Sequence, residues 1–197
     1  MSDGIADLLR HAAARATQRT SDYDLNDVSL PPGRKLTPAG VLVPVDAKTG
    51  NVVLTKRSAA LRNHAGQVAF AGGKQDPGDA DVVEAALREA EEEIGLSREL
   101  VDVVGRMPPH ETVTSFSVTP VLAVVGEGYR QKREIGEVSE IFEVPLSHFM
   151  DRRNFRIEER MWKGGPRKYF VVPYGPFYIW GATARMLRAL CDAMEEG

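Results

Sequence analysis

The sequence lacks the features that mark several classes of protein. It contains one cysteine, Cys191, in 197 residues, which excludes an internal disulfide and any zinc site built from several cysteines. Its formal net charge is -3, so no general excess of positive charge favours binding to nucleic acid or to a membrane. The first residues contain no long apolar run and carry an early acid, Asp3, which argues against a signal peptide or membrane anchor. We therefore expect a cytosolic protein.

The composition predicts one substantial core, because 43% of the residues are hydrophobic and a chain of this length favours a single domain. Residues 4–17 show the spacing of a short amphipathic helix, and residues 21–38 are rich in Pro, Asp and Ser. We expect residues 1–37 to form this helix and an irregular lead-in, without a chemical role. Residues 38–197 would then form the globular domain, with Cys191 as a buried thiol in a C-terminal helix.

Several apolar runs predict strands. Residues 39–45 and 51–55 are separated by a turn that contains Gly50, which is typical of a hairpin. Residues 100–105 and 118–125 are expected to be strands, and segments 155–157 and 169–174 to form a second hairpin. A helical pattern begins near residue 179. Strands interleaved with helices favour an α+β chain, folded as an α/β/α sandwich around a mixed sheet.

The most informative stretch is residues 72–96, GGKQDPGDADVVEAALREAEEEIGL. Asp81 stands three residues before Glu84, as in a capping box, and Gly95 stands where a left-handed glycine ends a helix. These signals predict a helix from about Val82 to Ile94, preceded by a loop that contains two adjacent glycines.

The carboxylates of this helix are expected to gather on one side. Glu89, Glu92 and Glu93 fall together, roughly opposite an apolar stripe. Three negative charges at this spacing repel one another, so a cation that prefers oxygen ligands, magnesium or manganese, would compensate them. The alternative is a solvated acidic face. The turn at Gly72 and Gly73 favours the metal, because a backbone carbonyl can approach an ion there and no side chain blocks a phosphate.

Residues 88–96, REAEEEIGL, resemble the second half of the Nudix box, R-E-U-x-E-E-x-G-U. The first half departs from the general pattern, because Asp79 replaces the usual glutamate and eight residues, not seven, separate it from Arg88. This loop is similar to that of the coenzyme A pyrophosphatases, G-G-x-x-D-x-x-D, which is matched by Gly72, Gly73, Asp76 and Asp79.

A second motif precedes the box. Residues 54–73 carry four basic side chains close to the acidic loop, Lys56, Arg57, Arg62 and His64. On the residues alone, the arginines would either bind phosphate groups or pair with the acids of the box. The stretch also resembles the coenzyme A pyrophosphatase pattern L-T-x-R-S-x-x-x-R-x-x-x-G-x-x-x-F-P-G-G, which favours phosphate binding. Ala71 departs from it, since the family usually has proline there.

The resemblance implies a Nudix-like fold and a set of roles. Glu89 and Glu93 would be the first metal ligands, followed by Glu92 and the Gly72 carbonyl, and Arg88 would orient these carboxylates. The substrate would be held by Arg57, Arg62, Ser58 and Gly73.

The base that activates water is expected among the glutamates of the box and of a later loop. By resemblance Glu137 occupies the place of an additional glutamate, with Glu140 in reserve and Glu92 as the candidate within the box. The alternative for Glu137 is an ordinary charged residue at a strand edge. His110 has no partner fixed by spacing, which favours a surface location.

The implied reaction is metal-dependent hydrolysis of coenzyme A or its thioesters to 3',5'-ADP and (acyl-)4'-phosphopantetheine. One alternative is a Nudix hydrolase of another nucleoside diphosphate derivative, such as ADP-ribose or NADH. A second is a non-catalytic nucleotide-binding domain, which we rank lower because all three box glutamates are present. We expect a small-molecule substrate, no nucleic-acid or membrane partner, and include a homodimer among the expectations.

Overall fold

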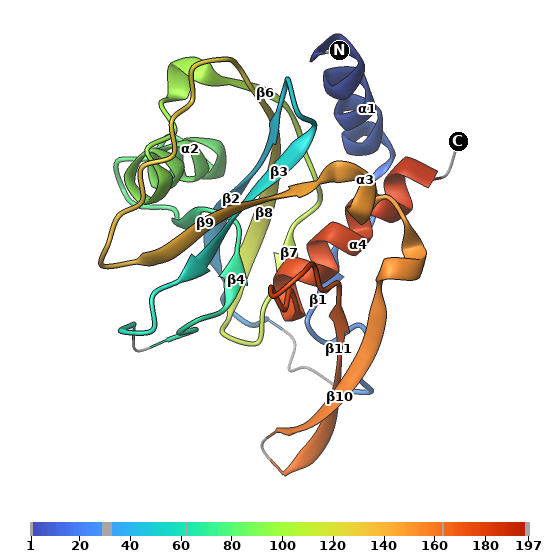
Figure 1. Cartoon of the computed structure of the whole chain (residues 1–197). Coiled ribbons are helices and arrows are strands. Elements are labelled where there is room, and N and C mark those ends of the chain that lie inside the picture. The colour runs from blue at the N-terminus through green and yellow to red at the C-terminus, as the bar shows by residue number, and fades with distance from the viewer. Residues whose placement is uncertain (1, 29–32, 62, 163, 196–197) are drawn as a thin grey trace.

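The computed structural model describes residues 2–28, 33–61, 63–162 and 164–195. A mixed sheet forms its centre, with helix α2 (Val82–Ile94) on one face and helices α1 (Ser2–Arg15) and α4 (Gly181–Glu195) on the other (Figure 1). The α+β class and the α/β/α sandwich around a mixed sheet are confirmed.

Two long strands run parallel through the middle of the sheet. Strand β2 pairs with β8 over ten residues, while β3 pairs antiparallel with β2, β4 and β9. In the described part of the chain the order is β1-β7-β8-β2-β3-β4, with β5 beside β2, β6 beside β8 and β9 beside β3. The strands are β1 Thr20–Ser21, β2 Thr37–Asp46, β3 Asn51–Arg57, β4 Val68–Ala69, β5 Gly72–Lys74, β6 Val101–Arg106, β7 His110–Glu111, β8 Phe116–Val125 and β9 Val138–Pro145.

Alternate residues of the long strands pack on the two faces of the sheet. In β8, Val121 and Ala123 face α2, whereas Leu122 and Val124 face α1 and α4. This alternation follows from the period of two in a strand. It explains why these central strands are apolar throughout, because both faces are covered.

Helix α2 has the boundaries that its sequence predicts. The Asp81 carboxylate accepts hydrogen bonds from the backbone N–H groups of Val83 and Glu84, at 2.8 and 3.0 Å. Gly95 ends the helix at φ 69°, a conformation in which glycine avoids the strain of a Cβ atom. The strongest local signals in the chain therefore fix the helix that carries the box.

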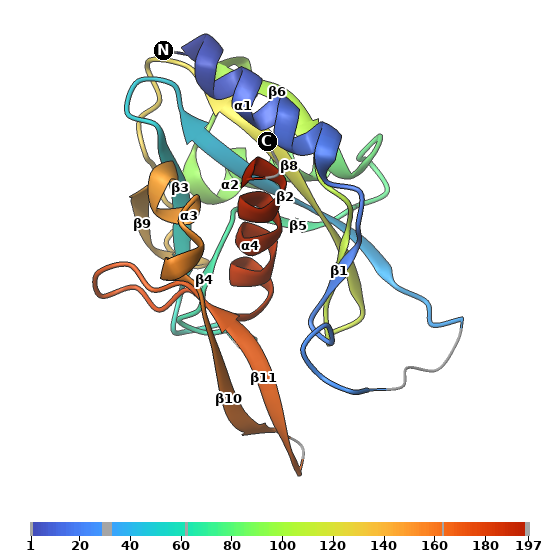
Figure 2. The ribbon, with the colours of Figure 1, turned by 90° about the vertical axis from the view of Figure 1, so that its right-hand side faces the viewer.

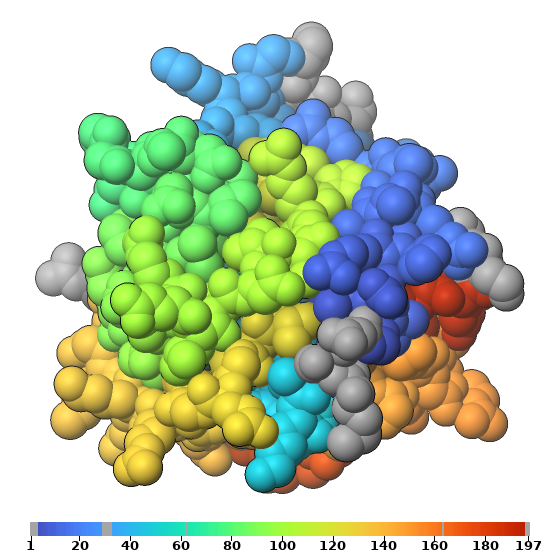
Figure 3. Space-filling view, turned by 90° about the horizontal axis from the view of Figure 1, so that it is seen from above, coloured from blue at the N-terminus to red at the C-terminus, as the bar shows by residue number. Residues whose placement is uncertain are grey.

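Helix α1 packs on the sheet and beside α4. Ala6, Leu9 and Ala12 are buried in the same cluster as the core of α4. Its contact with β6 is close, since a Cβ atom on Gly105 would lie 2.6 Å from the Cβ of Ala13. In Figure 3 the blue N-terminal segment lies against the yellow-green part of the chain. The helix was predicted to pack, and it does; the division of the chain at residue 37 stays a prediction.

The second hairpin extends away from the sandwich (Figure 2). Strands β10 (Arg156–Trp162) and β11 (Gly165–Val171) are longer than the sequence indicates. The C-terminal helix begins at Gly181, slightly later than expected, and its Cys191 is buried as predicted. The remaining helices are α3 (Leu146–Phe149) and two short 3-10 turns, Arg98–Leu100 and Arg152–Asn154. None of the helices described is long and apolar enough to cross a membrane.

Two expectations, for His110 and for the lead-in, are wrong. His110 is fully buried, at 0% exposure, instead of lying on the surface. The lead-in is not wholly irregular, because Thr20–Ser21 pairs in parallel with His110–Glu111. Both errors have one cause: the partner of each segment lies about ninety residues away along the chain, which local patterns do not reveal.

Candidate active site

Two glutamates of α2 face the glycine turn that precedes the helix. A Cβ atom on Gly73 would collide with the carboxylate of Glu89, and the backbone N–H of Gly72 lies 3.4 Å from Oε2 of Glu93. A Cβ atom on Gly72 would collide with the backbone of Gly40 and Val41 in β2. Gly72 is thus required by its close approach to the neighbouring strand, whereas a side chain at position 73 would displace the Glu89 carboxylate.

Glu93 is the most buried of the three box glutamates, with 3% of its surface exposed. Burial raises the pKa of Glu93 to about 7, and the negative charges of Glu89 and Glu137 add to the rise. The positive charge of Arg57 and the Gly72 N–H act against it without cancelling it. The pKa of Glu89 is also raised, mainly by burial. The cluster therefore holds more negative charge than its surroundings compensate.

Arg88 donates hydrogen bonds to three carboxylates. Its Nε and Nη2 donate to the two oxygens of Asp79, at 3.0 and 3.1 Å. Its Nη1 donates to Glu89 at 3.0 Å and to Glu92 at 3.2 Å. The hydrogen bonds with Arg88 lower the pKa of Asp79, which stays ionised. These are the contacts expected of a residue that orients the carboxylates of the box.

The three box glutamates do not converge on one point. Glu92 has 59% of its side chain exposed and contacts Arg88 at the surface, whereas Glu93 is buried. In the part of the chain that the structure describes, no three His, Cys, Asp or Glu side chains are arranged to hold a metal ion. The expected convergence is therefore limited to Glu89 and Glu93, because tertiary packing draws Glu93 into the protein.

The donors that do face the glycine turn still fit a magnesium or manganese ion. They are carboxylate oxygens, the ligand type that both ions prefer. Burial raises the pKa of Glu93, and the nearby charge of Glu89 adds to the rise, so a cation bound there would stabilise the ionised form.

A loop after β8 covers the end of α2 and carries Glu137. Tyr129 donates its hydroxyl to the Ile94 carbonyl at 3.1 Å, and the backbone N–H of Glu134 donates to the Glu93 carbonyl at 2.9 Å. The Glu134 carboxylate accepts from the N–H of Glu137 at 2.7 Å. Glu137 is exposed, and its charge acts on both Glu89 and Glu93. Glu140 is not one of the charges that raise the pKa of Glu89 or Glu93.

The same loop is joined to the strand that carries Arg57. Ser58 donates its N–H to the Glu137 carbonyl at 2.7 Å. The Ser139 hydroxyl donates to the Lys56 carbonyl at 3.0 Å. This loop and its links to β3 were not predicted as part of the site, and only the glutamate at position 137 gave a signal in the sequence.

The structure describes only some of the residues that were predicted to bind substrate. Nη1 of Arg57 lies 3.5 Å from Oε1 of Glu93. Arg57 therefore pairs with an acid of the box, which is one of the two roles that the sequence allows. The Ser58 hydroxyl accepts from Ala60 N–H at 3.3 Å and so shapes the turn after β3. Arg62 lies outside the described residues.

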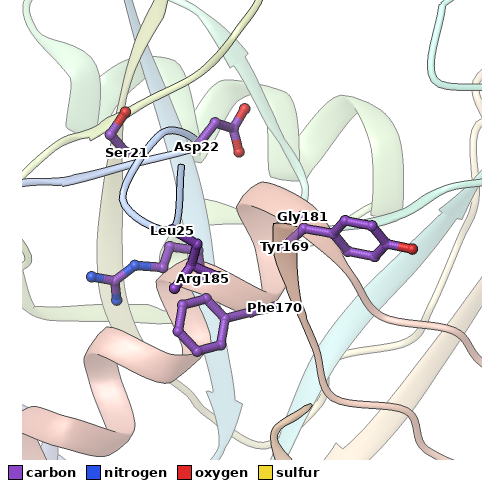
Figure 4. Close-up of a pocket in the computed structure, with 7 residues that line it drawn as sticks. All are labelled: Ser21, Asp22, Leu25, Tyr169, Phe170, Gly181 and Arg185. Carbon is purple, nitrogen blue, oxygen red and sulfur yellow. The ribbon is translucent and has the colours of Figure 1, made fainter. Parts of the chain in front are cut away.

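A second polar cluster lies far from α2. Thr20 Oγ1 is 2.9 Å from Nδ1 of His110, and His110 Nε2 is 3.4 Å from Asp22. Asp22 also accepts from Val113 N–H at 2.9 Å and lies 3.5 Å from Arg167. The hollow beside it has a volume of only about 10 Å³ (Figure 4), too little for more than a water molecule. We interpret this cluster as a structural link.

The comparison with protein families decides the family. The NUDIX domain model matches residues 36–163. The chain belongs to the Nudix family. The prediction of a Nudix hydrolase is thereby confirmed, and the Nudix box is the stretch that includes Arg88, Glu89, Glu92 and Glu93.

Curated relatives carry the same family name. An uncharacterized Nudix hydrolase NudL of Citrobacter koseri is 40% identical over 154 residues, which cover 77% of this chain and 80% of the relative. NudL of Cronobacter sakazakii is 40% identical over 159 residues, covering 80% and 83%. Their name leaves the substrate open.

Solved structures of Nudix proteins are more distant. An Ap4A hydrolase of C. elegans is 22% identical and covers 55% of this chain and 80% of its own, with a TM-score of 0.48. The MutT protein of Methanosarcina mazei is 25% identical and covers 62% and 84%, with a TM-score of 0.48. We carry nothing about substrate over from either.

Proposed function

We propose that the protein hydrolyses the pyrophosphate bond of coenzyme A or its thioesters, giving 3',5'-ADP and (acyl-)4'-phosphopantetheine. The observation that supports it most is the contact between Arg57 and Glu93 at 3.5 Å. Arg57 belongs to the motif that resembles the coenzyme A pyrophosphatases, and Glu93 belongs to the Nudix box. The motif that suggests the substrate is therefore joined to the carboxylates that suggest the chemistry.

In this proposal Glu89 and Glu93 hold a divalent cation, with the Gly72 carbonyl as a further ligand. Glu92 lies exposed beside Arg88 and would have to turn toward the ion to become a ligand. A bound magnesium or manganese ion would neutralise charge on the phosphate oxygens and lower the pKa of water. Arg88 keeps Glu89 and Glu92 in place through the hydrogen bonds described above.

The chain's own groups bind the phosphates and move the proton. Arg57, Arg62, Ser58 and the open backbone at Gly73 contact phosphate oxygens. Glu137 accepts a proton from the attacking water, whose oxygen forms a bond to phosphorus while the anhydride P–O bond breaks. Glu92 is the second candidate for this base. The electron pair of the broken bond leaves with the departing phosphate.

A substrate panel tests the proposal. Coenzyme A, acetyl-coenzyme A, ADP-ribose and NADH are incubated with enzyme and magnesium or manganese, and the products are separated. We expect 3',5'-ADP from the first two. Arg57→Gln should raise KM, while the exposed control Arg19→Gln should not. Cleavage of ADP-ribose or NADH with coenzyme A intact would assign another nucleoside diphosphate substrate, and binding without turnover would favour the non-catalytic domain.

The cytosolic location and the homodimer remain predictions of the sequence. Gel filtration of the purified chain tests directly whether it forms a homodimer. A monomer at the concentration of the assay would show that one chain contains the whole site.

A further inference from the structure

A cleft of about 360 Å³ lies between the end of β3 and the segment before α4. Its size is within the usual range for small-molecule sites. One wall is formed by the end of β3 and the start of β4, the other by the segment before α4. The lining residues are Lys56, Ala65, Gly66, Gln67, Val68, Pro176, Phe177, Tyr178 and Trp180.

The aromatic wall of the cleft is held by neighbouring side chains. Phe177 stacks on Phe142, with ring centroids 3.5 Å apart and nearly parallel. The guanidinium of Arg160 lies 4.2 Å from the centre of the Trp180 ring. Tyr178 is 43% exposed, and its hydroxyl donates to Glu158 at 2.6 Å. Rings fixed in this way lose little entropy on binding. Arg160 covers one face of Trp180, so a ligand would use the other face.

The opposite wall supplies a positive charge. Lys56 is exposed, and its ammonium group makes no ion pair within the part of the chain that the structure describes. Its cross-strand neighbour on β9 is Glu140, without a contact between the charges. A cation opposite a row of aromatic rings matches a nucleotide, whose base stacks and whose phosphate is anionic.

The cleft and the carboxylate site share strand β3. Arg57 follows Lys56 directly, and its backbone bonds to Gln67 and Gly66, at 2.9 and 3.1 Å, hold the β3 side of the cleft in shape. Arg57 reaches Glu93 on the α2 face, whereas Lys56 lines the cleft on the α4 face. A substrate that uses both must pass round the end of β3, where the chain turns at Ser58.

We propose that this cleft holds the nucleoside end of the substrate, with the base on Trp180 and Tyr178 and a ribose phosphate monoester on Lys56. The inference rests on the proposed function, which it deepens. It makes Lys56 the residue that distinguishes a substrate with a free ribose phosphate from one without. Coenzyme A carries such a 3'-phosphate; dephospho-coenzyme A, ADP-ribose and NADH do not.

The first test compares kcat/KM for coenzyme A and dephospho-coenzyme A. The native enzyme should prefer coenzyme A, and Lys56→Gln should reduce this preference about tenfold, as for the loss of one charge-assisted hydrogen bond. Lys48→Gln, on the exposed turn between β2 and β3, should leave the preference unchanged. An unchanged preference in Lys56→Gln overturns the assignment while hydrolysis of coenzyme A still stands.

The second test needs no turnover. The chain has two tryptophans, so Trp162→Phe leaves Trp180 as the only indole reporter. Adenosine 3',5'-bisphosphate, titrated without metal, should change its fluorescence more strongly at low concentration than AMP does, and Lys56→Gln should weaken this binding.

The two proposals can fail separately. Binding that depends on Lys56, in an enzyme that leaves coenzyme A intact, supports the cleft and contradicts the proposed reaction. Equal binding of adenosine 3',5'-bisphosphate by the native protein and Lys56→Gln contradicts the cleft, whatever the enzyme hydrolyses.

Discussion

Asp22 and Glu93 are both largely buried carboxylates, yet their surroundings shift their pKa values in opposite directions. Burial alone would raise the pKa of Asp22, but His110, the Val113 N–H and Arg167 outweigh it and lower the pKa. At Glu93 burial prevails, and the pKa rises to about 7. Polar groups around Asp22 satisfy its charge within the protein, whereas Glu93 is suited to a cation that comes from outside.

The difference separates stability from function. A carboxylate whose pKa is lowered by folding stabilises the folded chain, while one whose pKa is raised is retained at a cost in stability. Substitutions in the first cluster should therefore change the free energy of unfolding, and substitutions in the second should change turnover.

The largest effect is expected for Glu93→Gln. Loss of the charge that holds the cation should lower kcat roughly 10³-fold, equivalent to several kcal/mol of transition-state stabilisation. The metal-free variant should be no less stable than the native protein, because it removes a poorly compensated buried charge. Steady-state hydrolysis and urea unfolding without metal give the two values, and a variant that unfolds more easily while retaining turnover would reverse our assignment.

Gly73→Ala comes next. Its Cβ atom would collide with the Glu89 carboxylate, so Glu89 must move and kcat should fall roughly 10²-fold, as for a misplaced catalytic group. The matched control in the same loop is Gly78→Ala, where an added Cβ meets nothing within 4 Å. Equal turnover in the two variants would show that the position of Glu89 is unimportant.

Asp22→Asn should reduce the free energy of unfolding by about 2 kcal/mol at pH 7, since it removes the charge from a buried hydrogen-bond network. The pKa of Asp22 is lowered from 3.8, so its stabilising contribution is complete above pH 3.8 and is lost as the pH falls through the folded value. Urea titrations should show the native protein and the variant converging in acid.

Turnover per folded molecule should be the same in Asp22→Asn as in the native protein. The exposed Asp27→Asn serves as the control for stability. A pH-independent difference between Asp22→Asn and the native protein would mean that packing, and not ionisation, explains the effect.

The smallest effect is expected for Glu134→Ala. This exposed carboxylate accepts the N–H of Glu137 at 2.7 Å, and its loss should lower kcat about tenfold with little change in KM. Glu134→Gln keeps an acceptor oxygen and should restore most of the rate. If both variants behave alike, the negative charge of Glu134 matters and not its hydrogen bond to Glu137.

Local signals account for what could be predicted. The caps at Asp81 and Gly95 lie within one turn of α2, so they define its ends before any tertiary contact is known. The hairpin around Gly50 is equally local, and the register Val45 with Val52 follows from it. The resemblance of residues 88–96 to the Nudix box grouped Glu89 with the glycine turn, and the structure places its carboxylate against Gly73.

Long-range packing accounts for what could not be predicted. Helical periodicity groups Glu93 with Glu89 and Glu92 on one side of α2, but it does not show that Arg57 from β3 and the loop at Glu134 cover Glu93. His110 and Asp22 are separated by 88 positions, and neither residue gives a sign of the other. Burial of a polar residue depends on which distant segments meet, which a pattern within one window does not contain.

The most direct measurement is a paired one, in which kcat for coenzyme A with magnesium and the free energy of unfolding without metal are determined for Glu93→Gln and Asp22→Asn together. We predict loss of turnover with unimpaired stability in the first, and loss of stability with normal turnover per folded molecule in the second. If both variants lost turnover and stability in parallel, the results would contradict our distinction between the two sites. In that distinction Glu93 binds an external cation, and Asp22 belongs to a structural cluster whose charges are compensated within the protein.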